Sequence, residues 1–109
     1  MIDLVYNKLK ELGYEVYWQL RPKNFPSLTF SFISESGKDF ADDKEITTAI
    51  VCQVDIWSKE DYTELAKQVK SKMREIEFYR SGEYDDFEED TKIFHKVLRF
   101  NYLKESEEE

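Results

Sequence analysis

The sequence of 109 residues has few of the residues that mark several protein classes: one cysteine, one histidine, two prolines and three glycines. A single cysteine excludes an intramolecular disulfide and the multi-cysteine zinc patterns. The scarcity of glycine and proline, beside 16% aromatic residues, argues against a disordered or loop-rich chain. No apolar run is long enough to span a bilayer, and the N-terminal stretch carries polar residues too often for a signal peptide. These absences predict one ordered domain, made in the cytoplasm, that folds without disulfide or metal.

The strongest structural signal is the stretch from Ile46 to Ile76, which predicts a long strand followed directly by an amphipathic helix. One face of the strand, from Ile46 to Trp57, carries Ile46, Thr48, Ile50, Cys52, Val54 and Ile56. From Ser58 the period becomes helical, and the apolar stripe comprises Tyr62, Leu65, Ala66, Val69, Met73 and Ile76. Ser58 and Asp61 predict an N-cap with a capping box. A strand of about 40 Å beside a helix of about 28 Å must extend beyond its cover by about 10 Å.

Shorter patterns predict the remaining elements. They are a helix from Ile2 to Leu12 ending at Gly13, strands over Tyr14 to Leu20 and Leu28 to Ser36, a polar loop from Lys38 to Glu45, a short strand over Phe78 to Arg80 before a turn at Ser81 and Gly82, and a strand over Thr91 to Leu103. We therefore predict an α+β fold, with a mostly antiparallel four- to five-stranded sheet and two helices packed on one face, in the order α-β-β-β-α-β-β. Residues 1–104 form the expected domain and residues 105–109 an acidic disordered tail.

The net charge of −8 is concentrated in two short runs. The first, called the acidic strip below, comprises Glu83, Asp85, Asp86, Glu88, Glu89 and Asp90. The second is the C-terminal run of four acids, and without these two runs the chain has 14 acids and 16 bases. The simplest interpretation of such runs is a solvated loop and tail. The strip could also mimic nucleic acid toward a basic partner, or repel DNA that must slide past.

Residues that could carry chemistry are isolated. His95 has no ligand partners at a metal-binding spacing, so pairing across the sheet is favoured. Cys52 lies on the apolar face of its strand, which indicates a small core residue rather than a nucleophile. The acidic strip lacks the alternation and central glycine of a calcium loop. Trp18 shares the apolar face of its strand, whereas Trp57 lies opposite Ile56 and is the better surface candidate. We predict no catalytic, cofactor-binding or metal-binding residues.

Two stretches carry a family resemblance. They are Gln53 to Ser58, continued by Tyr62 to Ala66, Val69-Lys70 and Met73, and the C-terminal Asp90-Thr91, His95-Lys96 and Arg99 to Tyr102. These stretches resemble the small tail completion, or head-tail joining, proteins of long-tailed phages and of prophages in Gram-positive bacteria. That family often breaks its second helix with a glycine before an aromatic residue, where this chain has Glu77 before Phe78. The motifs are structural, so they locate no active site.

The resemblance implies a non-enzymatic virion assembly factor that completes the tail and joins it to the DNA-filled head as a ring of subunits. The implied partners are tail tube or tail terminator proteins, head connector proteins and further copies of the chain, with no cofactor, membrane or sequence-specific nucleic acid. It implies a place in the bacterial host cytoplasm during assembly and then at the head-tail junction of the virion.

Self-association is expected through the overhanging strand and the polar loop, with the acidic strip facing solvent or the DNA path. The expected interface residues are Phe40, Asp42, Asp43, Ile46 and Trp57. One rival hypothesis is a cellular ligand-binding or regulatory module with a pocket lined by Tyr17, Trp57 and Tyr79. A second rival is an acidic nucleic-acid mimic that inhibits a DNA-binding protein.

Overall fold

The computed structural model describes the backbone of residues 2–41 and 44–105 and the side chains of residues 2–33 and 50–102. The elements follow in the order α1 (Ile2–Lys10), β1 (Glu15–Trp18), β2 (Ser27–Ala41), β3 (Lys44–Ser58), α2 (Thr63–Glu75), β4 (Tyr79–Glu88) and β5 (Ile93–Glu105). The strands form one sheet in the spatial order β1-β2-β3-β5-β4. This arrangement confirms the predicted α+β class and element order.

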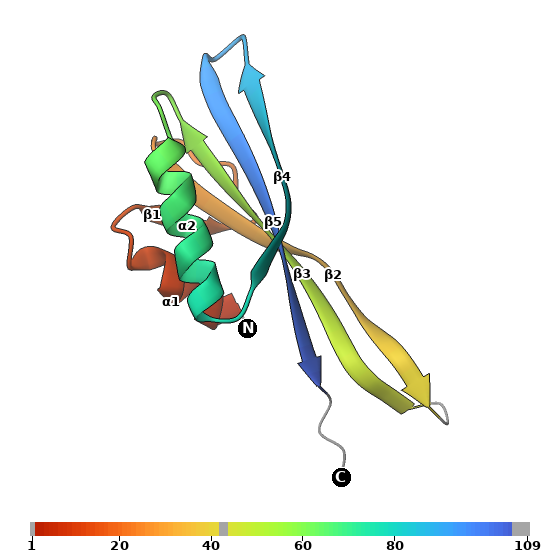
Figure 1. Cartoon of the computed structure of the whole chain (residues 1–109). Coiled ribbons are helices and arrows are strands. Elements are labelled where there is room, and N and C mark those ends of the chain that lie inside the picture. The colour runs from red at the N-terminus through yellow and green to blue at the C-terminus, as the bar shows by residue number, and fades with distance from the viewer. Residues whose placement is uncertain (1, 42–43, 106–109) are drawn as a thin grey trace.

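The core lies between the sheet and the two helices, which cover the same face (Figure 1). Leu65, Val69 and Met73 of α2 belong to one buried cluster with Cys52 and Val54 of β3, as the two sequence periods predicted. From α1, Val5 and Leu9 are fully buried, whereas Ile2, the apolar first residue of the predicted helix, is exposed. The short helix α1 therefore attaches to the core mainly through its second half.

The strand β1 is shorter than predicted and pairs with β2 in parallel, while every other neighbouring pair is antiparallel. A direct hairpin would have a tight turn of a few residues. Here residues 19–26, which contain both prolines, return the chain to the end of the sheet where β1 began. The backbone N–H of Gln19 donates to the carbonyl of Phe30 at 3.0 Å, which holds the start of this connection against β2.

The start of α2 differs from the prediction. Ser58 is the last residue of β3, and its hydroxyl bonds the backbone of Glu60 rather than capping a helix. The carboxylate of Asp61 instead accepts hydrogen bonds from the backbone N–H and the hydroxyl of Thr63, the first residue of α2. The predicted capping box was therefore wrong, because Ser58 bonds the backbone of the connection before the helix, whereas Asp61 bonds Thr63 at the start of the helix.

The end of α2 is a Schellman motif without glycine. The N–H of Phe78 donates to the carbonyl of Met73, and the N–H of Glu77 to the carbonyl of Arg74, both at 2.9 Å. Glu77 has a φ of 67°, in the left-handed region that glycine adopts most easily. The helix thus ends where the family resemblance places its break, but with a residue that carries a Cβ.

The strand β4 is much longer than predicted. The expected turn at Ser81 and Gly82 is a bulge within the strand, because the register with β5 shifts between Arg80 and Gly82. Four acids of the strip lie in β4, which forms one edge of the sheet. The assignment of the strip to a loop was therefore wrong for its first four acids, since an edge strand also tolerates charged side chains.

The strands β2 and β3 continue well beyond the helices, with β5 beside β3, and form an arm with no helix over it (Figure 1). The predicted loop Lys38 to Glu45 was wrong, since β2 reaches Ala41 and Ala41 pairs with Lys44. The 15 residues of β3 span about 50 Å, against about 20 Å for the 13 residues of α2. The predicted overhang is confirmed and larger than estimated, and the described chain measures 52 × 26 × 21 Å.

Candidate functional site

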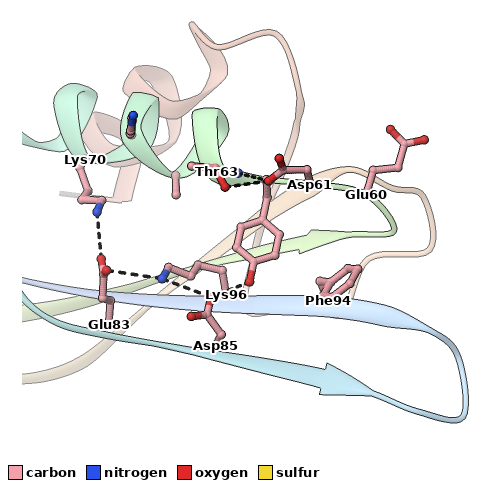
Figure 2. A pocket seen from close by; sticks show the side chains of 11 residues that line it. Glu60, Asp61, Thr63, Lys70, Glu83, Asp85, Phe94 and Lys96 are labelled. Atoms are coloured by element: carbon pink, nitrogen blue, oxygen red, sulfur yellow. Dashed lines mark hydrogen bonds and ion pairs between the residues drawn. The ribbon is translucent and has the colours of Figure 1, made fainter.

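A groove lies between the first half of α2 and the β4–β5 pair (Figure 2). Its volume is about 590 Å³, and the residues that line it include Glu60, Asp61, Tyr62, Lys70, Glu83, Asp85, Phe94 and Lys96. The strands β4 and β5 supply the floor because Glu83, Asp85 and Phe87 pair with Leu98, Lys96 and Phe94 on the helix-covered face. Helix α2 and the connection before it supply the opposite wall.

Lys96 is the central cation of the groove and is only 8% exposed. Its Nζ lies 3.4 Å from Oε2 of Glu83 and 3.2 Å from Oδ1 of Asp85, as Figure 2 shows. Lys70 of α2 reaches the other side of Glu83, with Nζ 3.0 Å from Oε1. The hydrogen bond from Lys70 lowers the pKa of Glu83 below its ordinary value. These ion pairs connect the edge strand β4 to the helix α2, and they neutralise the charge of the nearly buried Lys96.

Aromatic side chains gather at the end of the groove nearest the β4–β5 turn. The ring of Phe94 lies 5.9 Å from that of Tyr62 and 4.7 Å from that of Phe87, measured between centroids. The hydroxyl of Tyr62 donates to Asp85, and burial together with this bond raises the pKa of Tyr62 to about 12. Phe87 and Phe94 are nonetheless 40% and 37% exposed, so this cluster is accessible from outside.

The opposite face of the sheet holds a second cluster around Trp57. Its indole N–H donates to the hydroxyl of Thr29 at 2.9 Å, and the ring of His95 stacks on the indole at 3.8 Å between centroids. Nε2 of His95 lies 2.9 Å from Oδ2 of Asp55 on the neighbouring strand, which confirms the predicted cross-sheet pairing. Trp57 is 8% exposed, so the expectation that it lies at the surface was wrong: these neighbours cover its ring.

Arg21, in the loop after β1, contacts this second cluster. Its guanidinium lies 4.9 Å from the centroid of Trp57 and donates two hydrogen bonds to the carboxylate of Glu88, at 2.9 and 2.6 Å. The bidentate pairing lowers the pKa of Glu88 to about 2. A single side chain thus bridges the loop, the sheet face and the last residue of β4.

The two residues with potential reactivity do not form a chemical site in the described part of the chain. Cys52 is fully buried, as predicted, and burial raises the pKa of its thiol to about 12, so it is a poor nucleophile at neutral pH. Among the described residues, no three His, Cys, Asp or Glu side chains are arranged to hold a metal ion. Neither α1 nor α2 has the length and apolarity needed to cross a membrane.

The predicted interface residues are placed only in part. Phe40 lies in β2 and Ile46 in β3, both in the arm, and their side chains are outside the described ones. Asp42 and Asp43 lie outside the described residues, as do positions 106–109 of the expected tail. The pocket expected from Tyr17, Trp57 and Tyr79 does not form, because Tyr17 and Tyr79 lie on β1 and β4, the two opposite edges of the sheet.

Several residues of the two clusters were not predicted as site residues from the sequence, and Lys96, Tyr62 and Arg21 are the most informative. Lys96 interrupts the apolar face of Phe94, Leu98 and Phe100, and a base at a core-facing position is a signal that acids lie nearby. Tyr62 was assigned to the apolar stripe without regard to its hydroxyl. The position of Arg21 depends on the path of the loop after β1, for which no sequence period exists.

Comparison with known proteins identifies a similar fold. No protein-family model matches the chain, and no curated protein matches it. Among solved structures, the chain is similar to a chain of the "Virion of native gene transfer agent (GTA) particle". The superposition has a TM-score of 0.59 with 14% sequence identity and covers 94% of this chain and 92% of that chain. At this identity the likeness shows a shared fold extending over nearly the whole of both chains.

Proposed function

We propose that this chain is a virion assembly protein that completes a phage tail and joins it to the DNA-filled head. The observation that carries the proposal is the fold shared with a virion chain over 94% of this chain and 92% of the other. Coverage of this extent favours a likeness of the whole fold over one common motif. The motifs around Gln53 to Ser58 and Arg99 to Tyr102 support the same role.

The proposed protein acts by binding rather than by catalysis, and its copies form a ring on the growing particle. The arm supports this role, because the free edge of its outer strand leaves backbone groups for pairing with a neighbour. The proposed subunit contact includes Phe40 and Ile46 of the arm, with Asp42 and Asp43 between them. Three acids of the strip are paired internally, with Lys70, Lys96 and Arg21, which weakens the hypothesis of a nucleic-acid mimic.

The test is removal of the gene from the phage or prophage that encodes the chain, followed by electron microscopy of the particles. We expect filled heads and separate tails, and restoration of joined particles when purified protein is added. Joined particles in the absence of the protein would refute the proposal.

The subunit contact is tested separately by Phe40→Asp, assayed by joining purified heads to purified tails. A charge in the proposed contact should block joining while the variant stays folded. Leu4→Asp is the matched control, because Leu4 is 44% exposed on α1 and lies away from the arm. Equal joining by the parent and Phe40→Asp would place the contact elsewhere.

A further inference from the structure

The outer edge of β4 is open along its length. The strand β4 is the last strand of the sheet, and within the described residues no strand pairs with it on the side away from β5. Beyond the bulge, the segment Gly82 to Glu88 keeps a continuous register with β5. Alternate residues of this segment therefore direct their N–H and C=O groups outward, where an extended chain can pair with them.

The acids of Gly82 to Glu88 protect this edge against pairing with another acidic strand, but not with a basic one. Open strands are commonly protected by charged side chains, lysine above all, by proline, by a bulge or by shortness. Gly82 to Glu88 contains neither lysine nor proline, and the bulge lies before it. Its side chains are exposed aromatics and acids, with Tyr84 54% exposed and Phe87 40% exposed. Exposed aromatic rings beside carboxylates provide cation–π and ion-pair contacts for arginine and lysine.

The charge around the edge favours a basic occupant. The acidic strip and the groove rim, with Glu60 and Asp61, carry eight acids. Seven bases lie among or beside them, and these are Lys67, Lys70, Lys96, Arg21, Arg80, Lys92 and Arg99. Asp86 projects on the face opposite the groove, and within the described residues its carboxylate bonds only the N–H of Phe87. The edge thus stays net negative after its internal pairs are counted.

A second copy of this chain does not fit the edge. Pairing β4 with β4 of another copy would set acids against acids, since four of the seven residues from Gly82 to Glu88 are acidic. The free edge of β2 beyond β1 offers one base, Lys38, against Glu35 and Asp39. Neither edge of the same sheet supplies the positive charge that this strand would attract.

We propose that the outer edge of β4, from Gly82 to Glu88, docks an extended arginine- and lysine-containing segment of a different protein as an additional strand. The backbone of β4 supplies the pairing, and Asp86 and the rings of Tyr84 and Phe87 select basic side chains. On the groove side, the occupant's side chains lie beside Phe87 and beside Asp85, which Figure 2 shows at the edge of the groove. This inference is independent of the proposed role in the virion, because it concerns a different edge from the arm.

The test uses the whole protein labelled with 15N and a short synthetic peptide in which lysine and arginine alternate with valine. We expect saturable binding, with amide exchange slowed at alternate residues of Gly82 to Glu88. A peptide with glutamate in place of the bases is the control probe, and it should not bind. Asp86→Lys should weaken binding by about tenfold or more, because it reverses a charge without breaking an internal ion pair. Phe87→Ser should weaken it through the lost apolar contact.

Matched controls separate docking from general effects of charge and surface. Glu77→Lys changes the charge equally in the turn between α2 and β4, and Leu4→Ser removes a similarly exposed apolar side chain from α1. Both should bind the peptide like the parent. The proposal is overturned by an absence of binding, by equal affinity in Asp86→Lys, or by binding that leaves the β4 amides unprotected. Pairing of β4 with a second copy, seen as a β4–β4 contact in solution, would overturn it as well.

Discussion

The left-handed residue at the end of α2 makes a quantitative prediction possible. Glu77 has a φ of 67° and donates its N–H to Arg74, so the Schellman geometry is complete while its Cβ opposes the conformation. A residue with a Cβ destabilises the folded state by roughly 1–2 kcal/mol when it adopts the left-handed conformation, whereas glycine adopts it at almost no cost in free energy. Glycine also raises the entropy of the unfolded chain, which reduces the gain in stability by about 0.4–1 kcal/mol. We therefore expect Glu77→Gly to stabilise the protein by about 0.5–1 kcal/mol.

Chemical denaturation of three variants checks this reasoning. Glu77→Ala removes the charge and keeps the Cβ, so its effect isolates any repulsion between the carboxylate and the helix C-terminus. Gln68→Gly places glycine at an exposed position inside α2, where it should destabilise by about 0.5–1 kcal/mol. A gain in Glu77→Ala equal to that in Glu77→Gly would assign the effect to charge and refute the argument from backbone strain.

Further predictions concern the core, a buried hydrogen bond and an ion pair. Leu65→Ala should destabilise by about 2–5 kcal/mol in denaturant titration, and a change below about 1 kcal/mol would mean that Leu65 does not contribute to the core. Thr29→Val should destabilise by about 1–3 kcal/mol because it leaves the Trp57 N–H buried without an acceptor, whereas Thr29→Ser should restore most of the loss. The pKa of Glu88 is lowered to about 2 by Arg21, so the stabilisation from this pair is complete above about pH 4.5 and disappears as the pH falls toward 2. The difference in stability between the parent and Arg21→Gln should shrink over that range, and a constant difference would contradict the assignment.

The sequence predicted the fold where one physical pattern dominates. In β3 the period of two reflects a buried face, and in α2 the stripe of Leu65, Val69 and Met73 reflects contact with that face. Burial is encoded residue by residue, so these elements and their mutual packing could be predicted. The boundaries were less accurate, because the hydroxyl of Ser58 and the carboxylate of Asp61 each have several backbone groups within reach.

The candidate site could be predicted only in part, because its members come from elements that share no local pattern. The groove combines α2 with two strands, and the cluster on the opposite face combines a loop residue, Arg21, with β3, β4 and β5. The strand β4 was mistaken for a loop because its sequence does not alternate apolar and polar residues. The partners of its acids, Lys70 and Lys96, are distant in the chain, so the pairing emerges only from the sheet register.

The ion pairs divide the acidic strip into two groups with different expected roles. Glu83 and Asp85 compensate Lys96, whose side chain is 11% exposed, whereas Asp86 and Glu89 make no ion pair among the described residues. In the double variant Glu83→Gln and Asp85→Asn, the nearly buried ammonium group of Lys96 loses both of its carboxylate partners.

We expect this variant to be about 1–3 kcal/mol less stable than the parent, since the nearly buried Lys96 ammonium loses both of its charged partners. Neutralising Asp86 and Glu89 in the same way should change stability by less than about 0.5 kcal/mol, as for most surface positions. Thermal or urea unfolding of the two double variants compares the groups directly. If both double variants lost the same stability, the strip would act as a single electrostatic surface and Lys96 would not depend on its two neighbours. If only the Glu83→Gln and Asp85→Asn variant lost stability, a variant with the whole strip neutralised could fail to bind a partner because it unfolds. A test of docking should then substitute only residues without ion pairs, such as Asp86.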